Sequence, residues 1–213
     1  MQRYAVYYAP RPGTFADHAA AWLNGIALPT IAANQREGPR RYGFHGTLRA
    51  PFRPADSVTL DDIISGVAAL VARMAPVECD GLWLENLDGF LALTPIGDTA
   101  ALSDLASEVV RGTNALRAPL TAIDVARRRP EALTAQQRAL MEAWGYPFVM
   151  EAFQFHLTLT DRLPSADAAA TAIALQAYFA DVLPRPFRVE DLCLFGEDTA
   201  GAFHLLHRYP LLG

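Results

Sequence analysis

The sequence predicts an α+β fold of two lobes related by a pseudo-twofold axis, with antiparallel sheets lining a central cleft and helices outside. Three observations predict it: a short motif occurs twice, each copy is followed by the same order of elements, and the composition allows a sizeable core. The motif is FHGTL at residues 44–48 and FHLTL at residues 155–159. The chain has 213 residues, 52% hydrophobic and 19% charged, which suits a single bilobal domain.

The first lobe is expected to span residues 1–116. Apolar periodicity and turn residues predict its elements in order. They are a strand at 3–9, a helix at 14–23, an irregular stretch at 29–42, a strand at 44–50, a helix at 59–74, strands at 77–85 and 90–94, and a helix at 102–116. The first motif therefore lies on a strand that is followed by a helix and a pair of strands.

The second lobe, 151–213, is expected to repeat this order after an insert at 117–150. The insert is predicted to carry a helix at 134–144; the second lobe is predicted to hold a strand at 153–160, a helix at 166–182 and strands at 187–195 and 202–208. Pro76 and Pro186 follow the two motif histidines at nearly the same interval, and a Leu-x-Leu follows each proline. Such a duplication would place the two motif strands side by side at the centre.

Residues within each motif strand alternate between its two faces. In the second copy the apolar side chains share one face and the polar side chains share the other. The polar residues are Gln154, His156, Thr158 and Thr160 in the second copy and His45, Thr47 and Arg49 in the first. A slip of one residue would bury the histidines, so the register is expected to be fixed with the polar faces lining the cleft.

These residue types indicate acid–base chemistry on a phosphodiester. An imidazole titrates near ~6.5, so one histidine can accept a proton while the other donates one. Cleavage of a phosphodiester needs both steps. His45 and His156 are therefore the candidate catalytic pair, and the hydroxyl groups of Thr47 and Thr158 are placed to hold the non-bridging oxygens.

Three further residues are candidate substrate contacts. Arg49 would add positive charge on the face that carries His45, and Tyr42 would lie at the rim of the cleft. Thr160 would lie on the polar face of the second motif strand.

Other kinds of site have weaker support. A single His-x-Thr is more often a hydrogen-bonded surface pair, but two copies at matching places favour a function. Neither motif has a cysteine or carboxylate at metal-ligand spacing, so no metal and no cofactor are expected. In the insert, Arg127–Arg129 is either a solvated charge cluster or an edge that steers phosphate. Nearby aromatic residues either pack the insert or form a wall of the cleft; they are Trp144, Tyr146 and Phe148.

The two motifs resemble those of the 2H phosphoesterase superfamily, named for two motifs of the form His-x-Thr/Ser-apolar. The chain further resembles one branch, the DUF1045 proteins, which are often called phosphonate metabolism proteins. The similar stretches are 3–7, 41–48, 89–93, 126–129, 144–147 and 153–160. Those at 126–129 and 144–147 are the most specific because they lie in the insert. Gly46 stands where many relatives carry a larger residue, which is expected to affect packing only.

The resemblance implies a metal-free site that hydrolyses or transesterifies a 2′,3′-cyclic or related phosphodiester. It implies that His45 and His156 act as acid and base and that Thr47 and Thr158 bind the phosphate. By association, the name of the branch suggests a ribosyl cyclic phosphate. Two alternatives stay open: a module that binds nucleotide or phosphate without turnover, and an enzyme that processes RNA ends and resembles the 2′,5′ RNA ligases.

Composition limits the partners. The net charge of -5 argues against a long nucleic acid, and no apolar run is long enough to span a membrane. A small phosphorylated substrate is therefore the expected partner. Cys79 and Cys193 suggest free thiols in a reducing compartment, and the N-terminus lacks the apolar region of a signal peptide, so a bacterial-type cytoplasmic enzyme is expected. The sequence leaves open the oligomeric state and which histidine is the base.

Overall fold

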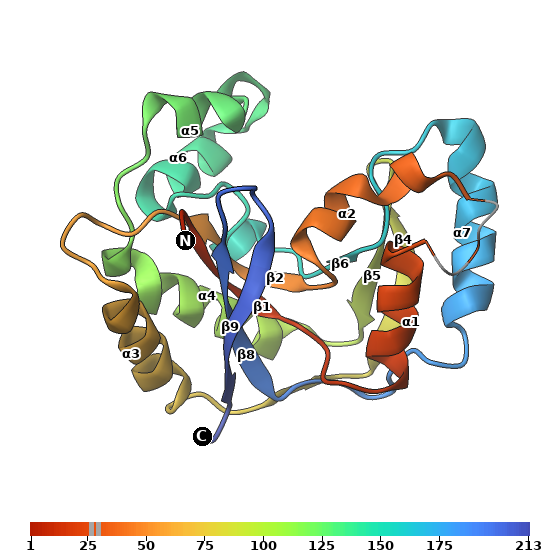
Figure 1. Cartoon of the computed structure of the whole chain (residues 1–213), viewed down its shortest axis with the longest axis horizontal. Coiled ribbons are helices and arrows are strands. Elements are labelled where there is room, and N and C mark those ends of the chain that lie inside the picture. The colour runs from red at the N-terminus through yellow and green to blue at the C-terminus, as the bar shows by residue number, and fades with distance from the viewer. Residues whose placement is uncertain (26–27, 29–30) are drawn as a thin grey trace.

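The computed structural model describes residues 1–25, 28 and 31–213 and has the expected α+β architecture (Figure 1). The strands are β1 (Tyr4–Tyr8), β2 (Gly46–Phe52), β3 (Val77–Cys79), β4 (Gly81–Leu87), β5 (Phe90–Ile96), β6 (Leu157–Thr158), β7 (Phe187–Val189), β8 (Asp191–Glu197) and β9 (Phe203–Pro210). The helices are α1 (Thr14–Leu23), α2 (Glu37–Tyr42), α3 (Leu60–Val71), α4 (Ala100–Thr113), α5 (Ala122–Arg127), α6 (Ala135–Trp144) and α7 (Ser165–Phe179).

Seven strands form one antiparallel sheet in the order β4-β5-β6-β2-β1-β8-β9, and β3 pairs with β7 in a separate ribbon. The two motif strands, β2 and β6, are neighbours near the middle of the large sheet. Gly46 of β2 lies opposite Leu157 of β6. The motif strands therefore lie side by side, as the repeat predicts.

The order of elements is duplicated along the chain. A helix, a short strand and a hairpin follow each motif strand: α3, β3 and β4-β5 follow β2, and α7, β7 and β8-β9 follow β6. The hairpins cross over in the sheet, because β4-β5 lies beside β6 whereas β8-β9 lies on the side of β2. The pairing is not strictly twofold, since β1 intervenes between β2 and β8 while β5 contacts β6 directly. Each half of the sheet thus takes strands from both halves of the chain, and the division into residues 1–116, 117–150 and 151–213 stays a prediction.

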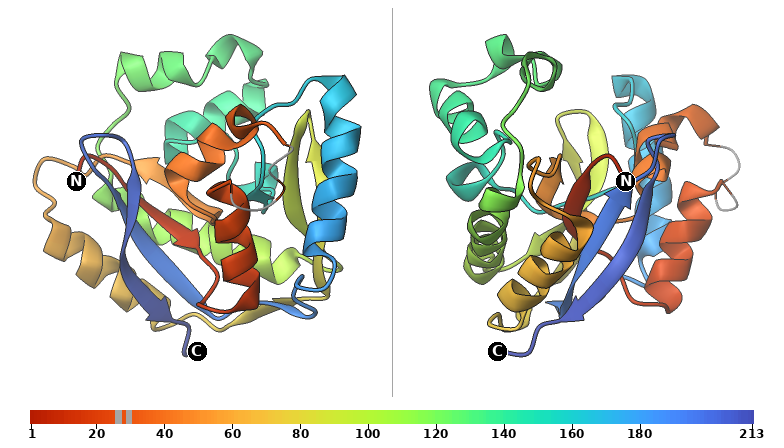
Figure 2. Two further views of the ribbon diagram at one scale, coloured as in Figure 1. Left: turned by 45° about the vertical axis from the view of Figure 1, so that its right-hand side comes forward. Right: turned by 60° about the vertical axis from the view of Figure 1, so that its left-hand side comes forward.

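In Figure 1, helices α3 to α6 gather on the left of the molecule and α1, α2 and α7 on the right (Figures 1 and 2). Residues of α1, α3, α4 and α7 are buried together in one main core. The apolar face of the motif strands packs into the main core, where Leu48, Leu157 and Leu159 are buried. The fully buried Trp22 of α1 donates its indole N–H to the carbonyl oxygen of Leu159 at 2.8 Å. This packing directs the other face of both motif strands, which carries the histidines, away from the core.

Three local predictions are wrong. Residues 31–42 of the stretch expected to be irregular form a short 3-10 turn and α2; residues 29–30 lie outside the described residues. Gly38 and Pro39 argue against a helix there, but the carboxylate of Asp161 accepts the Gly38 N–H at 3.0 and 3.2 Å and so stabilises the first turn. The second concerns α5, a helix that the sequence does not predict. This helix has six residues, is capped by Thr121 and Asp124, and is too short for a periodic signal.

The third wrong prediction is the strand at 153–160. Only Leu157 and Thr158 are paired in it, because the chain enters β6 from a short 3-10 turn at Met150–Ala152.

Candidate functional site

The strand register brings the two motifs together on one face of the sheet. Because Gly46 lies opposite Leu157 in an antiparallel pair, His45 lies across from Thr158 and Thr47 lies across from His156. Gly46 and Leu157 are buried, whereas the other four residues are half-buried. The structure therefore assembles the two histidines and two threonines predicted from the sequence into one group.

The two imidazoles are held in the same way. The Nδ1 of His45 lies 2.9 Å from the carbonyl oxygen of Gly43, and the Nδ1 of His156 lies 2.9 Å from the carbonyl oxygen of Gln154. A carbonyl oxygen can only accept a hydrogen bond, so each Nδ1 carries a proton. In the neutral ring the Nε2 atom is then the unprotonated nitrogen, available to take up a proton.

The surroundings of His45 favour its neutral form. Burial, with a contribution from the nearby His156, lowers the pKa of His45 to about 4, against the opposing effect of the Gly43 carbonyl. The ring of the buried Tyr7 lies against His45, with the two ring centroids 4.0 Å apart. Burial also lowers the pKa of His156, whose ring centroid lies 5.7 Å from that of Phe90. At neutral pH both imidazoles of the free protein are therefore mainly uncharged.

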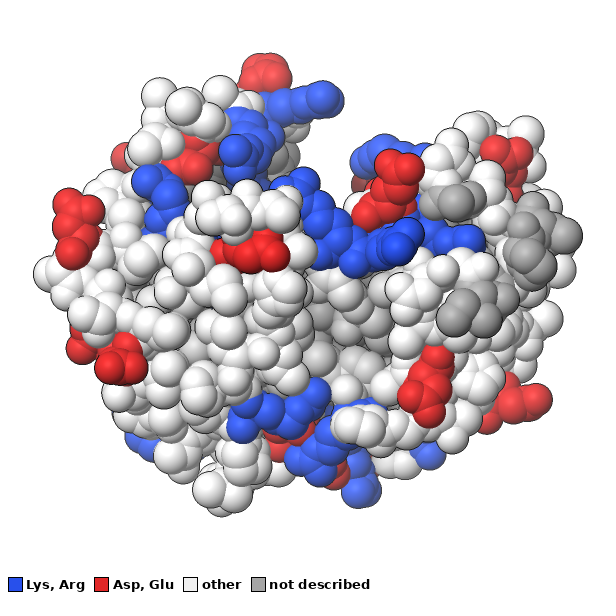
Figure 3. All heavy atoms as spheres, in the orientation of Figure 1, with Lys and Arg blue, Asp and Glu red and all other residues white. Residues whose placement is uncertain are grey.

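A cleft of about 750 Å³ opens beside this group. His45, Thr47 and Thr158 line it, whereas His156 is not among its lining residues. The charged residues that line the cleft are Arg3, Arg41, Arg53, Arg127 and Arg128, together with Asp124, Asp161 and Glu197. Figure 3 shows basic side chains gathered along both walls of a notch in the surface. An excess of positive charge here, in a chain with a net charge of -5, suits an anionic ligand.

The three candidate substrate contacts have different surroundings. Tyr42 lines the cleft, with its ring centroid 6.1 Å from that of His45. Thr160 is buried and its hydroxyl oxygen accepts the N–H of Leu91 at 2.9 Å. That bond joins β5 to the segment after β6, so Thr160 has a structural contact instead of the expected place in the cleft.

Arg49 also differs from its expected position. Its guanidinium is buried and donates to the carbonyl oxygen of Trp144 at 2.8 Å, while Arg117 donates to that of Ala143 at 2.9 Å. The two cations thus bind the carbonyl end of α6, where positive charge is favourable. Burial, with a smaller effect of Arg117, lowers the pKa of Arg49 to about 10. Arg49 thus fastens the insert to β2. Its position differs from the expectation because local bulges in the β1–β2 pairing interrupt the alternation of side chains along β2.

Several lining residues were not singled out by the sequence. Tyr7 is hidden in a continuous apolar strand, all of whose residues are buried. Arg3 and Arg53 lie just outside β1 and β2 and reach the cleft from the strand ends. The run Arg127–Arg129 did carry a signal, and the structure divides it: Arg127 and Arg128 line the cleft.

The aromatic residues of the insert also divide. Tyr146 lines the cleft, and Phe148 is exposed. Trp144 is half-buried against an apolar cluster in which Leu140 and Val149 of the insert pack with Val110 of α4. Both expectations for this group thus hold for different members.

The described residues offer no metal-binding group, no disulfide and no membrane-spanning helix. No three His, Cys, Asp or Glu side chains come together there in a way that could hold a metal ion. Cys79 and Cys193 are free and buried. None of the described helices has the length and apolar character needed to cross a bilayer.

Comparison with known families matches residues 47–204 to a family described as "Protein of unknown function (DUF1045)". Two curated relatives, each named ribose 1,5-bisphosphate phosphokinase PhnN, are 34% identical to the chain. The match to the protein of Janthinobacterium sp. (strain Marseille) covers 100% of this chain and 51% of the relative. The match to that of Laribacter hongkongensis (strain HLHK9) covers 97% and 51%. The chain thus spans about half the length of the curated relatives it matches.

Solved structures with a looser likeness include E. coli LigT complexed with phosphate and TT0787 of Thermus thermophilus. The LigT complex has a TM-score of 0.47 and 15% identity, covering 100% of this chain and 98% of the other. TT0787 has a TM-score of 0.49 and 16% identity, covering 99% and 98%. The family match spans more than half of the residues and agrees with the resemblance seen in the sequence. The chain belongs to the DUF1045 family.

Proposed function

We propose that this protein is a metal-independent phosphodiesterase that opens a small cyclic phosphodiester by two-histidine acid–base catalysis. The observation that carries the proposal is the matched anchoring of the two imidazoles. In both motifs Nδ1–H donates to the carbonyl oxygen two residues back, and Nε2 makes no hydrogen bond within the described part of the chain. Two such nitrogens on one face are what the uptake of one proton and the release of another require.

The proposed reaction begins with water. The Nε2 of one imidazole takes a proton from the water as its oxygen bonds to phosphorus. The ester P–O bond opposite the attack breaks, and the second histidine, as an imidazolium, gives its Nε2 proton to the leaving oxygen. The product is a phosphate monoester, and the two histidines end with their protonation states exchanged.

The threonines complete this proposal. Thr47 and Thr158 lie across from the opposite motif's histidine and line the cleft, so their hydroxyl groups can donate to the non-bridging oxygens. These oxygens gain negative charge in the transition state, where hydroxyl donors are most effective.

The low pKa of His45 supports His45 as the base. The pKa of His45 falls to about 4, so its Nε2 is free to accept a proton across the neutral range. The pKa of His156 is also lowered, and an anionic phosphate bound beside it would raise that pKa and favour the imidazolium. His156 is then the acid that protonates the leaving group.

The substrate class is proposed from size and charge. A cleft of about 750 Å³ is in the range of small-molecule sites and is lined by more arginines than carboxylates. The name shared by the curated relatives concerns a phosphorylated ribose. It supports a ribosyl cyclic phosphate, or a nucleoside 2′,3′-cyclic phosphate, as the substrate of this chain, within phosphonate metabolism.

A panel of cyclic phosphates assayed in the presence of EDTA tests the proposal. The wild-type protein should convert a nucleoside 2′,3′-cyclic phosphate or a ribose 1,2-cyclic phosphate to a monoester, followed by ³¹P NMR. The His156→Gln variant should bind the same compound with little turnover. Binding of the panel by the wild type with no turnover of any member would favour a non-catalytic phosphate-binding module instead.

A further inference from the structure

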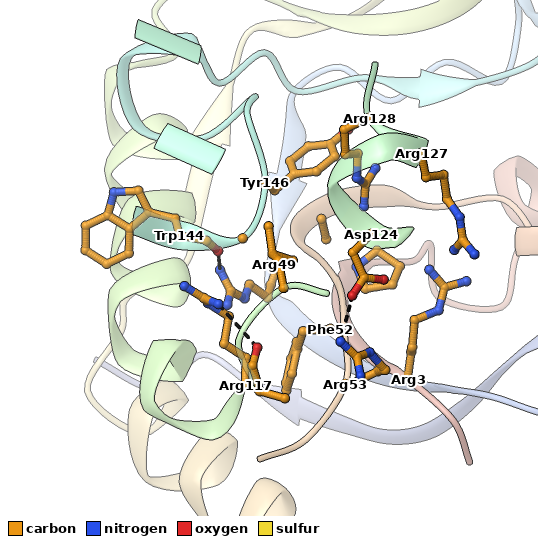
Figure 4. A pocket seen from close by; sticks show the side chains of 15 residues that line it. Arg3, Arg49, Phe52, Arg53, Arg117, Asp124, Arg127, Arg128, Trp144 and Tyr146 are labelled. Carbon is orange, nitrogen blue, oxygen red and sulfur yellow. Dashed lines mark hydrogen bonds and ion pairs between the residues drawn. The ribbon is translucent and has the colours of Figure 1, made fainter. Parts of the chain in front are cut away.

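The arginines of the insert converge on one end of the cleft. A smaller cavity adjoins the cleft there, and both are lined by Arg3, Arg53, Arg127 and Arg128 (Figure 4). Four guanidinium groups therefore meet at a place where only two carboxylates of the described residues, those of Asp124 and Glu197, pair with them. The fixed charge at this end of the cleft is positive.

Two of the four arginines are already paired. Arg3 binds Glu197 with a nitrogen–oxygen distance of 2.5 Å, and Arg53 binds Asp124 at 2.6 Å. The second pair fastens α5 to the end of β2, because Asp124 belongs to α5 and Arg53 follows the strand. Neither Arg127 nor Arg128 forms an ion pair with any described residue, so their charges remain available to a ligand.

Arg128 is held in place without losing its donors. Its guanidinium carbon lies 4.6 Å from the ring centroid of Tyr146, a stacked arrangement that leaves the N–H groups at the edge of the plane unoccupied. Tyr146 and Tyr42 line the same cleft. Burial raises the pKa of Tyr146, and the nearby phenol of Tyr42 raises it further. Tyr42 in turn lies beside His45. The stacked guanidinium is therefore only a few side chains away from the catalytic pair.

The local backbone selects which arginines face the cleft. α5 begins with a capping box of Thr121 and Asp124 and ends at Arg127, with Arg128 as its C-cap residue. Arg129 has a left-handed backbone with φ of 48°. The turn at Arg129 separates it from its neighbours, and Arg129 lines neither cavity. A solvated charge cluster would not require this division of three consecutive arginines.

We propose that Arg127 and Arg128 form a second anion site, which binds a phosphate monoester on the same substrate molecule whose cyclic phosphodiester lies between the histidines. The proposal rests on the function proposed above and specifies its substrate class: a small sugar or nucleoside cyclic phosphate that bears a further terminal phosphate. A planar guanidinium donates two parallel hydrogen bonds to a phosphate, so two arginines suffice for a dianion. Arg53 and Arg3, each paired with a carboxylate, complete the wall.

A matched pair of substrates tests the proposal. Ribose 1,2-cyclic phosphate is compared with its 5-phosphate for wild type, Arg127→Ala/Arg128→Ala and Arg129→Ala. Wild type should prefer the 5-phosphate by about tenfold or more in kcat/KM, and the double variant should lose this preference. Arg129→Ala removes a neighbouring charge and should keep the preference. A preference that survives in the double variant would overturn the assignment.

A binding measurement separates this proposal from the proposed catalysis. Calorimetry compares the affinities for ribose 1,5-bisphosphate and ribose 1-phosphate. This measurement needs no turnover. Wild type should bind the bisphosphate about tenfold or more tightly, and Arg127→Ala/Arg128→Ala should bind both alike. Equal affinities in wild type would refute the second site even if cyclic phosphates are hydrolysed. Conversely, a preference for the bisphosphate without turnover would support the site and refute the catalysis. Arg127 is exposed, so the single Arg127→Ala variant provides a folded protein with a partial loss.

Discussion

Replacing Gly46 by alanine should destabilise the protein through a clash with Phe155. Gly46 has no side chain, and a Cβ placed there would lie 2.5 Å from Cε2 of Phe155 and closer still to its Cζ. Carbon atoms in contact prefer about 3.5–4.0 Å, so the ring would have to move by about 1 Å or more. Phe155 is 4% exposed and packs against Tyr8 and Phe187, which restricts that movement.

Overpacking of this kind costs about 1–3 kcal/mol, and the lower chain entropy of alanine in the unfolded state returns up to about 1 kcal/mol. Gly46→Ala should therefore lower the free energy of unfolding by about 1–2 kcal/mol, or the Tm by about 2–8 °C for a chain of this size. Thermal and urea unfolding followed by circular dichroism measure both. The result would extend the sequence-based expectation that Gly46 affects packing only.

Gly66 is the matched control. A Cβ at Gly66, in the middle of α3, would lie 3.4 Å from Leu116, which is an ordinary contact. Gly66→Ala should be neutral or stabilising by about 0.5–1 kcal/mol. Phe155→Leu should make Gly46→Ala less costly, because the smaller side chain leaves room for the Cβ. A Gly46→Ala protein as stable as wild type, or one not helped by Phe155→Leu, would refute this account of the packing.

The remaining predictions concern the site. As pH rises, kcat/KM should increase as His45 deprotonates, near its pKa of about 4, and should decrease as His156 deprotonates, below 6.5; an optimum above about pH 8 would contradict the assignment. Thr47→Val and Thr158→Val should each lower kcat by about 10²-fold with unchanged Tm, and an unaltered kcat would exclude a transition-state contact. Arg49→Ala should lower the free energy of unfolding, measured in urea, by about 2–3 kcal/mol. Arg49→Met keeps the volume and removes a buried charge that has no carboxylate partner, so it should recover most of the lost stability. Equal losses in the two variants would show that the charge itself stabilises the protein.

The strands and long helices were predictable because their signals are periodic. The helix at Thr14–Leu23 agrees at both ends, and the two motif strands are adjacent as the repeat requires. The crossing of the hairpins was not predictable, since it depends on β1 inserting between β2 and β8. A sequence repeat shows that a unit was duplicated and does not show which copy each hairpin joins.

The site was predictable where side-chain alternation is regular and not elsewhere. His45, Thr47, His156 and Thr158 lie on one face because Gly46 and Leu157 are paired without a bulge between them. The alternation fails further along β2, where register shifts turn Arg49 away from the histidines. The contribution of α5 could not be found in this way, because a six-residue helix is positioned by its ion pair with Arg53 and by its caps.

The central claim is that His45 and His156 act as one acid–base pair, and a double-mutant comparison of turnover tests it most directly. Single-turnover rates on the best cyclic phosphate are measured for His45→Ala, His156→Ala and the double variant. Groups that act as a unit are non-additive, so each single variant should lose about 10²-fold or more and the double variant should lose little beyond that. Wild-type rates in either single variant, or losses that multiply in the double variant, would contradict a shared catalytic step.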